Sequence, residues 1–213
     1  GKDMPKKDVK YVDVPMSLDQ WRLYQLALDR LGPMAEYVTR RDKNVDVKDS
    51  EQLFTQLSQA RQIANSVHTG RNDMTHEQSA QKTPKVRKML DDAAEHLRKT
   101  PDGQVVLYTN LINGGVDVLS AGLRQRGIDH ALFIGKGTEV GGGTTTETTR
   151  QAGVDEFKAG KKRVIVLSGA GAEGLDLKNA TMFSSLDLHW NPERVLQAEA
   201  RARRLGGQAQ RLP

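Results

Sequence analysis

The chain has 213 residues, of which 37% are hydrophobic and 28% charged, and it contains no cysteine. This length suffices for one full domain with a small appendage. The lack of cysteine excludes disulfides and cysteine metal sites, and it fits a reducing compartment such as the cytoplasm, nucleoid or nucleus. A net charge of +5 allows an acidic partner such as nucleic acid without requiring one. No apolar run approaches the ~20 residues that cross a bilayer, so no membrane partner is expected.

The first 100 residues are predicted to be mostly helical, and Gly1 in place of an initiator Met suggests a fragment of a longer protein. Residues 9–15 alternate in polarity like a short strand. Ser17 and Gln20 form a capping-box pattern that opens an amphipathic helix. The apolar side chains near one face of this helix are expected to enter the core: Leu18, Trp21, Leu28 and Leu31. Two more helices are expected, with a polar loop between them: helix 49–66, loop 68–81 and helix 83–98.

From residue 103 onward, short apolar strands alternate with helices. Residues 104–109 are continuously apolar, as in a buried parallel strand. Further strands are predicted at 130–135, 163–168 and 181–187, with helices at 112–127 and 145–160. Strands that alternate with helices through short connections indicate an α/β fold with a parallel sheet. The Gly/Thr-rich segment 135–147 is expected to be flexible.

A last helix, beginning after Pro192, concentrates arginines on one face. At about 100° per residue, four side chains fall inside an arc of roughly 80°: Arg194, Gln197, Arg201 and Arg204. No carboxylate lies among them, whereas Arg203 lies on the opposite side. Guanidinium groups bind phosphate with a fixed forked geometry, so the face fits an anion. A solvated basic face is the alternative, and this helix alone does not decide between them.

A glycine-rich turn follows the strand at 163–168, at the end where open α/β sheets bind ligands. Residues 169–174 match GxGxxG, but no long helix follows, which disfavours a dinucleotide site. The glycines indicate a close approach of the backbone, either to a ligand or to neighbouring protein. No GxxxxGK[ST] loop occurs, so the chain lacks a complete ATP-hydrolysing site. Asp187 alone is weak evidence for a magnesium site, the five histidines have no metal-ligand spacing, and we predict no metal site.

Together these segments resemble the C-terminal lobe of the Swi/Snf family of ATP-dependent DNA translocases, in the second helicase superfamily. The resemblance covers nearly the whole chain and rests on these segments in this order: VPMSLDQWRLY, LSQARQIANS, QVVLYTN (motif IV), SGAGAEGLDL (motif V) and LDLHWNPERVLQAEARARRLGGQ, in which an Asp-x-x-Trp-Asn-Pro stretch runs into motif VI. Arg150, Val154 and Phe157 match the helix that precedes motif V. It implies an α/β fold with a RecA-like parallel sheet sandwiched by helices over residues 101–213. Residues 1–100 would form a linking strand and an N-terminal helical elaboration. The chain departs from the family pattern at Ala200, at Gln208 and in the longer insert 138–147.

The resemblance also implies roles for individual residues. Arg201 and Arg204 would be catalytic arginine fingers that reach the γ-phosphate of ATP. Gln197, Gly174 and Asp176 would lie beside the nucleotide. Four residues would lie near the phosphate backbone of nucleic acid: Thr109, Asn110, Ser168 and Gly169.

The implied partners are double-stranded DNA and the N-terminal helicase lobe of the same parent chain. That absent lobe would hold most of the ATP and Mg²⁺, so the chain is expected to hydrolyse ATP only as part of a two-lobe parent. The alternative is a non-enzymatic nucleic-acid-binding module on the same fold. Such a module has no reason to keep Arg201 and Arg204 where a γ-phosphate would lie. The interpretation as a free-standing Rossmann enzyme rests on the glycine pattern alone and is set aside.

Overall fold

The computed structural model describes residues 10–32, 47–67, 73–169, 175, 177 and 179–187. Its centre is a sheet of four parallel strands in the order β2-β5-β1-β6. The strands are β1 (Val105–Thr109), β2 (His130–Phe133), β5 (Val164–Ser168) and β6 (Met182–Ser185). The predicted parallel sheet is therefore confirmed, and each of these strands falls within or close to its predicted range.

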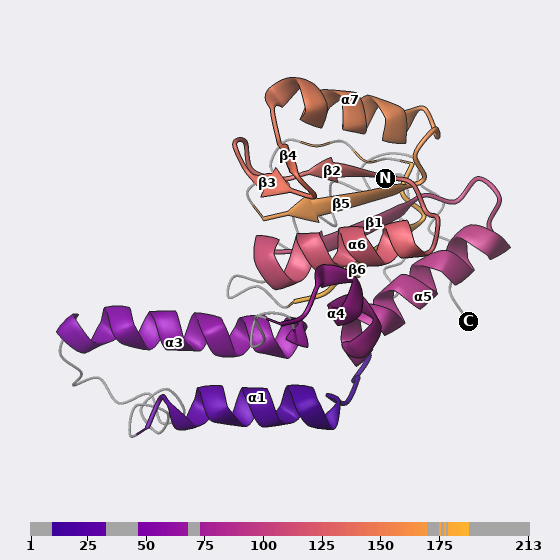
Figure 1. The fold of residues 1–213 in the computed structure, drawn as a ribbon. Helices are drawn as coiled ribbons and strands as arrows, with labels where there is room; N and C mark the ends of the chain where they lie inside the picture. Colours follow the sequence, from indigo (N-terminus) through magenta and orange to yellow (C-terminus); the bar gives the residue numbers. More distant parts are fainter. Residues whose placement is uncertain are drawn as a thin grey trace, which may run out of the picture.

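Helices cover both faces of this sheet (Figure 1). The helices of the described residues are α1 (Leu18–Asp29), α3 (Val47–Asn65), α4 (His76–Lys82), α5 (Pro84–Lys99), α6 (Asp117–Gln125) and α7 (Glu147–Lys158). The short kinked segment η2 (Ile112–Val116), in which Asn113 and Gly114 have non-helical backbone angles, leads into α6. On one face, α4, α5 and α6 pack against Val105, Leu107 and Val166. On the other face, α7 packs against the side chains that alternate with these, such as Val106 and Ile165. Alternation along a strand sends neighbouring side chains to opposite faces, which produces the two cores.

One of these cores joins helices from before residue 100 to the strands after it. Ala80 of α4 and Val86, Leu90 and Ala93 of α5 are fully buried in the same cluster as Leu107 of β1. The boundary between residues 1–100 and 101–213 stays a prediction.

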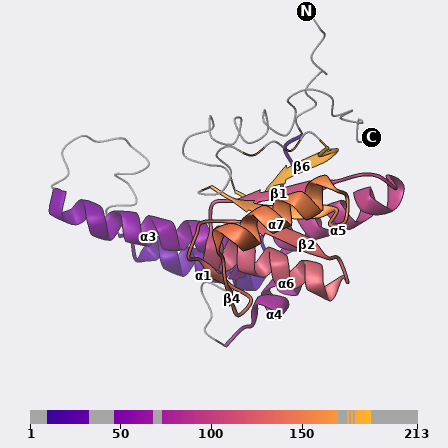
Figure 2. The same ribbon diagram turned by 90° about the horizontal axis from the view of Figure 1, so that it is seen from above.

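Helices α1 and α3 lie side by side and extend away from the sheet (Figures 1 and 2). A small apolar cluster holds them together, and the buried Gln20 donates from Nε2 to the carbonyl oxygens of Ile63 (2.8 Å) and Ala64 (3.2 Å). We call this pair the α1–α3 arm. Leu18 and Trp21, predicted to enter the core, are instead 61% and 51% exposed. The prediction is wrong for these two because α1 packs on α3 through a face that includes Leu23, Tyr24 and Leu28. Leu28, which packs against this cluster, and the buried Leu31 agree with the prediction.

Two more local expectations are wrong. The predicted strand at 9–15 does not form over its described part, residues 10–15, where Tyr11 is 80% exposed. Alternating polarity alone does not make a strand unless a neighbouring strand accepts its hydrogen bonds. The predicted loop 68–81 contains α4, which begins with a capping box between Thr75 and Gln78.

The Gly/Thr-rich segment forms a hairpin of β3 (Glu139–Val140) and β4 (Gly143–Thr144), where we expected a flexible stretch. Gly141 and Gly142 occupy the turn with φ of 61° and 83°. Positive φ at both central positions is typical of the two-residue turns that match strand twist. Within the described ranges, no helix is both long and apolar enough to span a lipid bilayer.

Candidate nucleic-acid interface

The carboxyl ends of β1, β5 and β6 meet at one edge of the sheet. Thr109, the last residue of β1, pairs with Ser168, the last residue of β5. Asn110 and Gly169 follow directly after these strand ends. The structure therefore brings together the four residues that the sequence assigned to nucleic-acid contact, although they come from motifs almost 60 residues apart. This edge is where open parallel sheets bind ligands.

Asn110 is held in one orientation by a buried carboxylate. Its backbone N–H donates to both carboxylate oxygens of Asp187, at 3.0 Å each, and its Nδ2 donates to Oδ2 of Asp187 at 2.8 Å. Tyr108 Oη donates to Asn110 Oδ1 at 2.8 Å. Asp187 is 7% exposed, so these charge-assisted bonds lie in a low-dielectric environment where they are strong. We call these contacts the Asn110–Asp187 clamp.

The clamp leaves no space for a side chain at Gly169. A Cβ at this position would lie 2.6 Å from Asn110 Oδ1 and 3.3 Å from Tyr108 Oη. Gly115 of η2 is restricted in the same way, because a Cβ there would lie 2.6 Å from Thr109 Oγ1. Gly169 thus allows the segments that follow β1 and β5 to approach each other closely, and Gly115 allows η2 to pack closely against the end of β1. Glycine is required at both positions because a Cβ would not fit there, and not because of a positive φ, which neither residue has.

The four predicted contact residues differ in exposure. Asn110 and Gly169 are partly exposed, whereas Thr109 and Ser168 are 0% and 2% exposed. Thr109 Oγ1 accepts a hydrogen bond from the N–H of Leu111 at 3.2 Å. Ser168 Oγ is buried and has no hydrogen-bond partner in the described part of the chain. In this structure the edge can therefore offer a ligand Asn110 and the backbone at Gly169, and Thr109 supports the turn beneath them.

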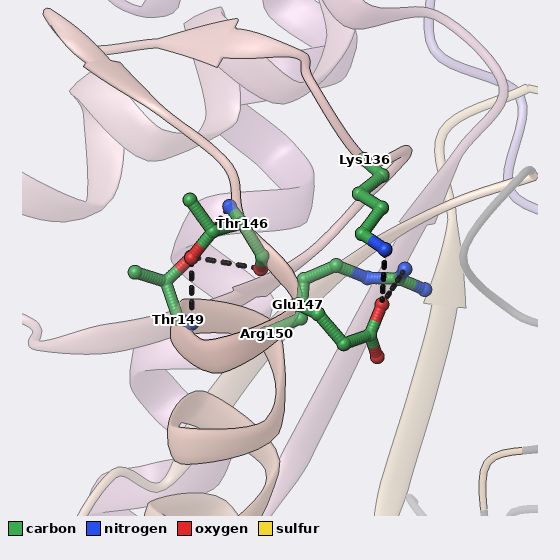
Figure 3. A network of polar contacts seen from close by, with 5 residues as sticks. All are labelled: Lys136, Thr146, Glu147, Thr149 and Arg150. Atoms are coloured by element: carbon green, nitrogen blue, oxygen red, sulfur yellow. Dashed lines mark hydrogen bonds and ion pairs between the residues drawn. The ribbon is translucent and has the colours of Figure 1, made fainter.

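Arg150 of α7, which the resemblance matches to the helix before motif V, contacts the last residue of β2 and also lies in a polar cluster with Glu147 and Lys136 (Figure 3). The Arg150 guanidinium lies 4.2 Å from the centre of the Phe133 ring and donates from Nη1 to Glu147 Oε2 at 3.2 Å. Lys136, from the segment before the hairpin, lies 3.8 Å from the same carboxylate oxygen. Arg150 has only 14% of its side chain exposed, so these contacts indicate a packing role.

Both ring nitrogens of His130 have hydrogen-bond partners within the protein. Its Nδ1 faces the carbonyl oxygen of Ile128 at 3.2 Å, and its Nε2 lies 2.6 Å from Ser120 Oγ. Because the carbonyl can only accept, Nδ1 carries the proton, and neutral Nε2 accepts from the Ser120 hydroxyl. Burial lowers the pKa of His130, with Arg124 acting in the same direction against the opposing contact with Ile128. Among the described residues, no group of three His, Asp or Glu side chains could hold a metal ion.

The remaining predicted site residues lie outside the described residues: Gly174, Asp176, Gln197, Arg201 and Arg204. The sequence did not assign Asp187 or Tyr108 to this edge. A signal for Asp187 existed, because it ends a predicted strand and therefore falls at the edge where the other strands end.

Comparisons with known proteins relate this chain to helicases. Residues 81–206 match the family model described as the helicase conserved C-terminal domain. An uncharacterized ATP-dependent helicase of Schizosaccharomyces pombe is 28% identical over 194 residues, which cover 89% of this chain and 17% of that protein. The chain spans between 16% and 21% of the length of three curated relatives that it matches.

Two solved structures from Sulfolobus solfataricus share the fold. The SWI2/SNF2 ATPase C-terminal domain has a TM-score of 0.62 at 16% identity, covering 82% of this chain and 69% of that one. The SWI2/SNF2 ATPase core in complex with dsDNA has a TM-score of 0.65 at 18% identity, covering 89% and 36%. The predicted RecA-like fold is confirmed by these two likenesses.

Proposed function

The chain belongs to the helicase conserved C-terminal domain family, with the fold of SWI2/SNF2 ATPase C-terminal domains, and from this premise we propose that it is the second motor lobe of an ATP-dependent double-stranded-DNA translocase. In this proposal the N-terminal lobe of the same parent protein carries most of the ATP and Mg²⁺ site. The present chain completes that site with arginines and contacts the DNA backbone. Closure of the two lobes on ATP then shifts this lobe along the duplex.

The observation that carries the proposal is the meeting of two separate motifs at one sheet edge. Thr109 and Asn110 come from motif IV, Ser168 and Gly169 come from the start of motif V, and the pairing of β1 with β5 joins them. A nucleotide-binding Rossmann enzyme would not require these residues of motifs IV and V to meet at one sheet edge. The likeness of the fold to a SWI2/SNF2 ATPase core that was solved with dsDNA supports the choice of ligand.

We assign the DNA contact to the partly exposed Asn110 and to the backbone at Gly169. Amide and backbone N–H groups bind phosphate oxygens and fix the register of a protein on a duplex without reading its base sequence. Thr109 and Ser168 are buried, so we assign them to the support of this edge. A translocase needs this kind of contact because it moves over all sequences.

We assign the hydrolytic step to Arg201 and Arg204, which act on the γ-phosphate held by the first lobe. Both arginines belong to the motif VI pattern and fall within the range that matches the family. Guanidinium groups stabilise the charge that develops on a transferring phosphoryl group, an effect worth roughly 10³–10⁵ in rate for arginine fingers. Gln197, Gly174 and Asp176 are assigned to the nucleotide side of the same cleft.

The test compares Arg204→Ala with Arg203→Ala in the two-lobe parent protein, since Arg203 is predicted on the opposite side of the same helix. Steady-state ATP hydrolysis with duplex DNA should fall about 10³-fold in Arg204→Ala and stay near wild type in Arg203→Ala. Thermal unfolding should be the same for both variants. Near-normal turnover in Arg204→Ala contradicts the arginine-finger assignment. A wild-type protein that binds duplex but never hydrolyses ATP favours the non-enzymatic binding module.

A further inference from the structure

Lys136 lies at the same edge of the sheet as the proposed DNA contacts. Phe133, the last residue of β2, pairs with Leu167 of β5, so the segment that follows β2 starts level with the end of β5. Lys136 belongs to that segment, just as Asn110 and Gly169 belong to the segments that follow β1 and β5. Neighbouring strands lie about 4.8 Å apart, and β5 separates β2 from β1, so this part of the edge is about 10 Å long. That length equals the axial rise of roughly three nucleotides of one DNA strand.

A β-turn fixes the backbone of Lys136. The N–H of Thr138 donates to the carbonyl oxygen of Gly135 at 3.3 Å, and Gly137 has a φ of 75°. A positive φ at the third position is typical of a type II turn, in which Lys136 occupies the second position. The hairpin holds this turn, because the N–H of Gly137 donates to the carbonyl oxygen of Thr145 at 2.8 Å. The side chain of Lys136 therefore starts from a fixed point at the sheet edge.

The neighbouring charges leave the Lys136 ammonium group available to a ligand. Glu147 Oε2 accepts a hydrogen bond from Arg150 at 3.2 Å, whereas Lys136 Nζ lies 3.8 Å from the same oxygen, beyond hydrogen-bond distance (Figure 3). The Arg150 side chain is largely buried beside Phe133, but 67% of the Lys136 side chain is exposed. Two cations and one carboxylate give this cluster an excess of positive charge, and Lys136 presents that excess to solvent.

The contacts already proposed at this edge are neutral. Asn110 offers an amide and Gly169 a backbone group, and Asp187, which holds Asn110, is a carboxylate. Neutral donors fix the position of a phosphate backbone, whereas much of the affinity for nucleic acid comes from lysine and arginine side chains that displace counterions. Lys136 supplies a positive charge at the edge where the neutral contacts lie.

We propose that Lys136 is a phosphate-binding residue of this lobe, which contacts the backbone of duplex DNA beside Asn110 and Gly169. The inference deepens the proposed function and rests on it. Glu147 is a positioning residue in this account, because it keeps the Lys136 ammonium group near the start of α7 while Arg150 offsets its charge. Lysine binds phosphate as a point charge, which suits a contact that a translocase makes on every sequence.

The first test measures duplex binding by the 213-residue chain as a function of salt concentration. Lys136→Met should reduce the slope of log affinity against log salt concentration by about 0.9, the value for one phosphate contact, and should weaken binding roughly tenfold near 0.1 M salt. Lys136→Arg keeps the charge and should keep the slope.

Lys158→Met is the matched control for this test. Lys158 is an exposed lysine at the other end of α7, where Phe157 accepts a hydrogen bond from Gln104, just before β1. Its loss should leave the slope at the wild-type value. Equal slopes in Lys136→Met and Lys158→Met, or no duplex binding by the wild type, overturn the proposal.

A second variant separates phosphate binding from a purely structural ion pair. Glu147→Gln removes the carboxylate beside Lys136 and should raise duplex affinity roughly two- to fivefold, because a negative charge near the bound phosphate is lost. An unchanged or lower affinity in Glu147→Gln contradicts the proposal. The Tm of Lys136→Met should stay within about 3 °C of wild type, since exposed ion pairs contribute little to stability. A larger fall would assign Lys136 to packing instead.

The third test uses the two-lobe parent protein and distinguishes the phosphates of DNA from those of ATP. Lys136→Met should raise the duplex concentration for half-maximal ATP hydrolysis roughly tenfold and leave the KM for ATP unchanged. A higher KM for ATP with an unchanged response to duplex would assign Lys136 to the nucleotide and overturn the proposal. If the wild type shows no duplex stimulation, the proposed function fails, whereas the salt slopes still decide the phosphate contact.

Discussion

Gly169→Ala tests the geometry of the sheet edge most simply, because it adds one carbon where the structure has no space. The new Cβ would lie 2.6 Å from Asn110 Oδ1, a distance at which one of the two atoms must move. Asn110 is not free to rotate, since Tyr108 and Asp187 hold the two ends of its amide group. The substitution should therefore break contacts of the clamp instead of causing a small local adjustment.

The hydrogen bonds that Gly169→Ala would break determine the expected loss in the free energy of unfolding. The neutral bond from Tyr108 Oη is worth about 0.5–1.5 kcal/mol, and the bond from Asn110 Nδ2 to the Asp187 carboxylate about 1.5–3 kcal/mol. Their loss predicts a decrease of about 2–4 kcal/mol in the free energy of unfolding. For a chain of this length, that corresponds to a fall in Tm on the order of 10 °C.

The assay is urea denaturation of the 213-residue chain, with Gly143→Ala as the control. Gly143 lies in the exposed hairpin, and a Cβ there would be 4.0 Å from its nearest neighbour, the carbonyl oxygen of Val140. The control should stay within about 0.5 kcal/mol of wild type. If Gly169→Ala is as stable as Gly143→Ala, the clamp is not rigid and the reasoning is refuted.

Two further predictions concern charge. The affinity of the chain for duplex DNA should weaken by at least roughly tenfold when the salt concentration rises from about 50 to about 200 mM, as two or more phosphate contacts require. An affinity that does not depend on salt concentration would argue against contacts with the DNA backbone. The free energy of unfolding should fall as pH drops below about 6.5, because the unfolded state takes up a proton on His130 while burial lowers the pKa of His130 in the folded state. His130→Gln should reduce this slope in denaturation curves recorded between about pH 5 and 7.5, and an unchanged slope would show that His130 does not contribute to it.

The core elements could be predicted from the sequence because their signals are local. The apolar run at Val105–Thr109 and the similar run at Val164–Ser168 need no knowledge of their partners to be identified as buried strands. Capping residues likewise mark helix starts, as Thr146 does for α7. Helix α4 has a capping box at Thr75, and the expectation of a loop there gave too much weight to polar composition.

Features that depend on distant partners could not be predicted in the same way. The exposure of Trp21 follows from the face of α1 that α3 covers, and the sequence does not specify that face. Asp187 was considered only as a weak metal ligand, because its contact with Asn110 appears only when β6 pairs with β1. The hydrogen bond from Lys85 of α5 to Asn65 of α3 likewise depends on the packing of two helices that are separate in the sequence. The family resemblance predicted which residues lie at this sheet edge, and the structure showed that Asp187 and Tyr108 hold Asn110 in place there.

The most direct test of the central claim is steady-state ATP hydrolysis by the two-lobe parent protein without nucleic acid, with single strands and with duplex DNA. The proposed role as a second motor lobe predicts strong stimulation by duplex and weaker stimulation by single strands. Equal hydrolysis under the three conditions, or none under any of them, would contradict a duplex-dependent motor.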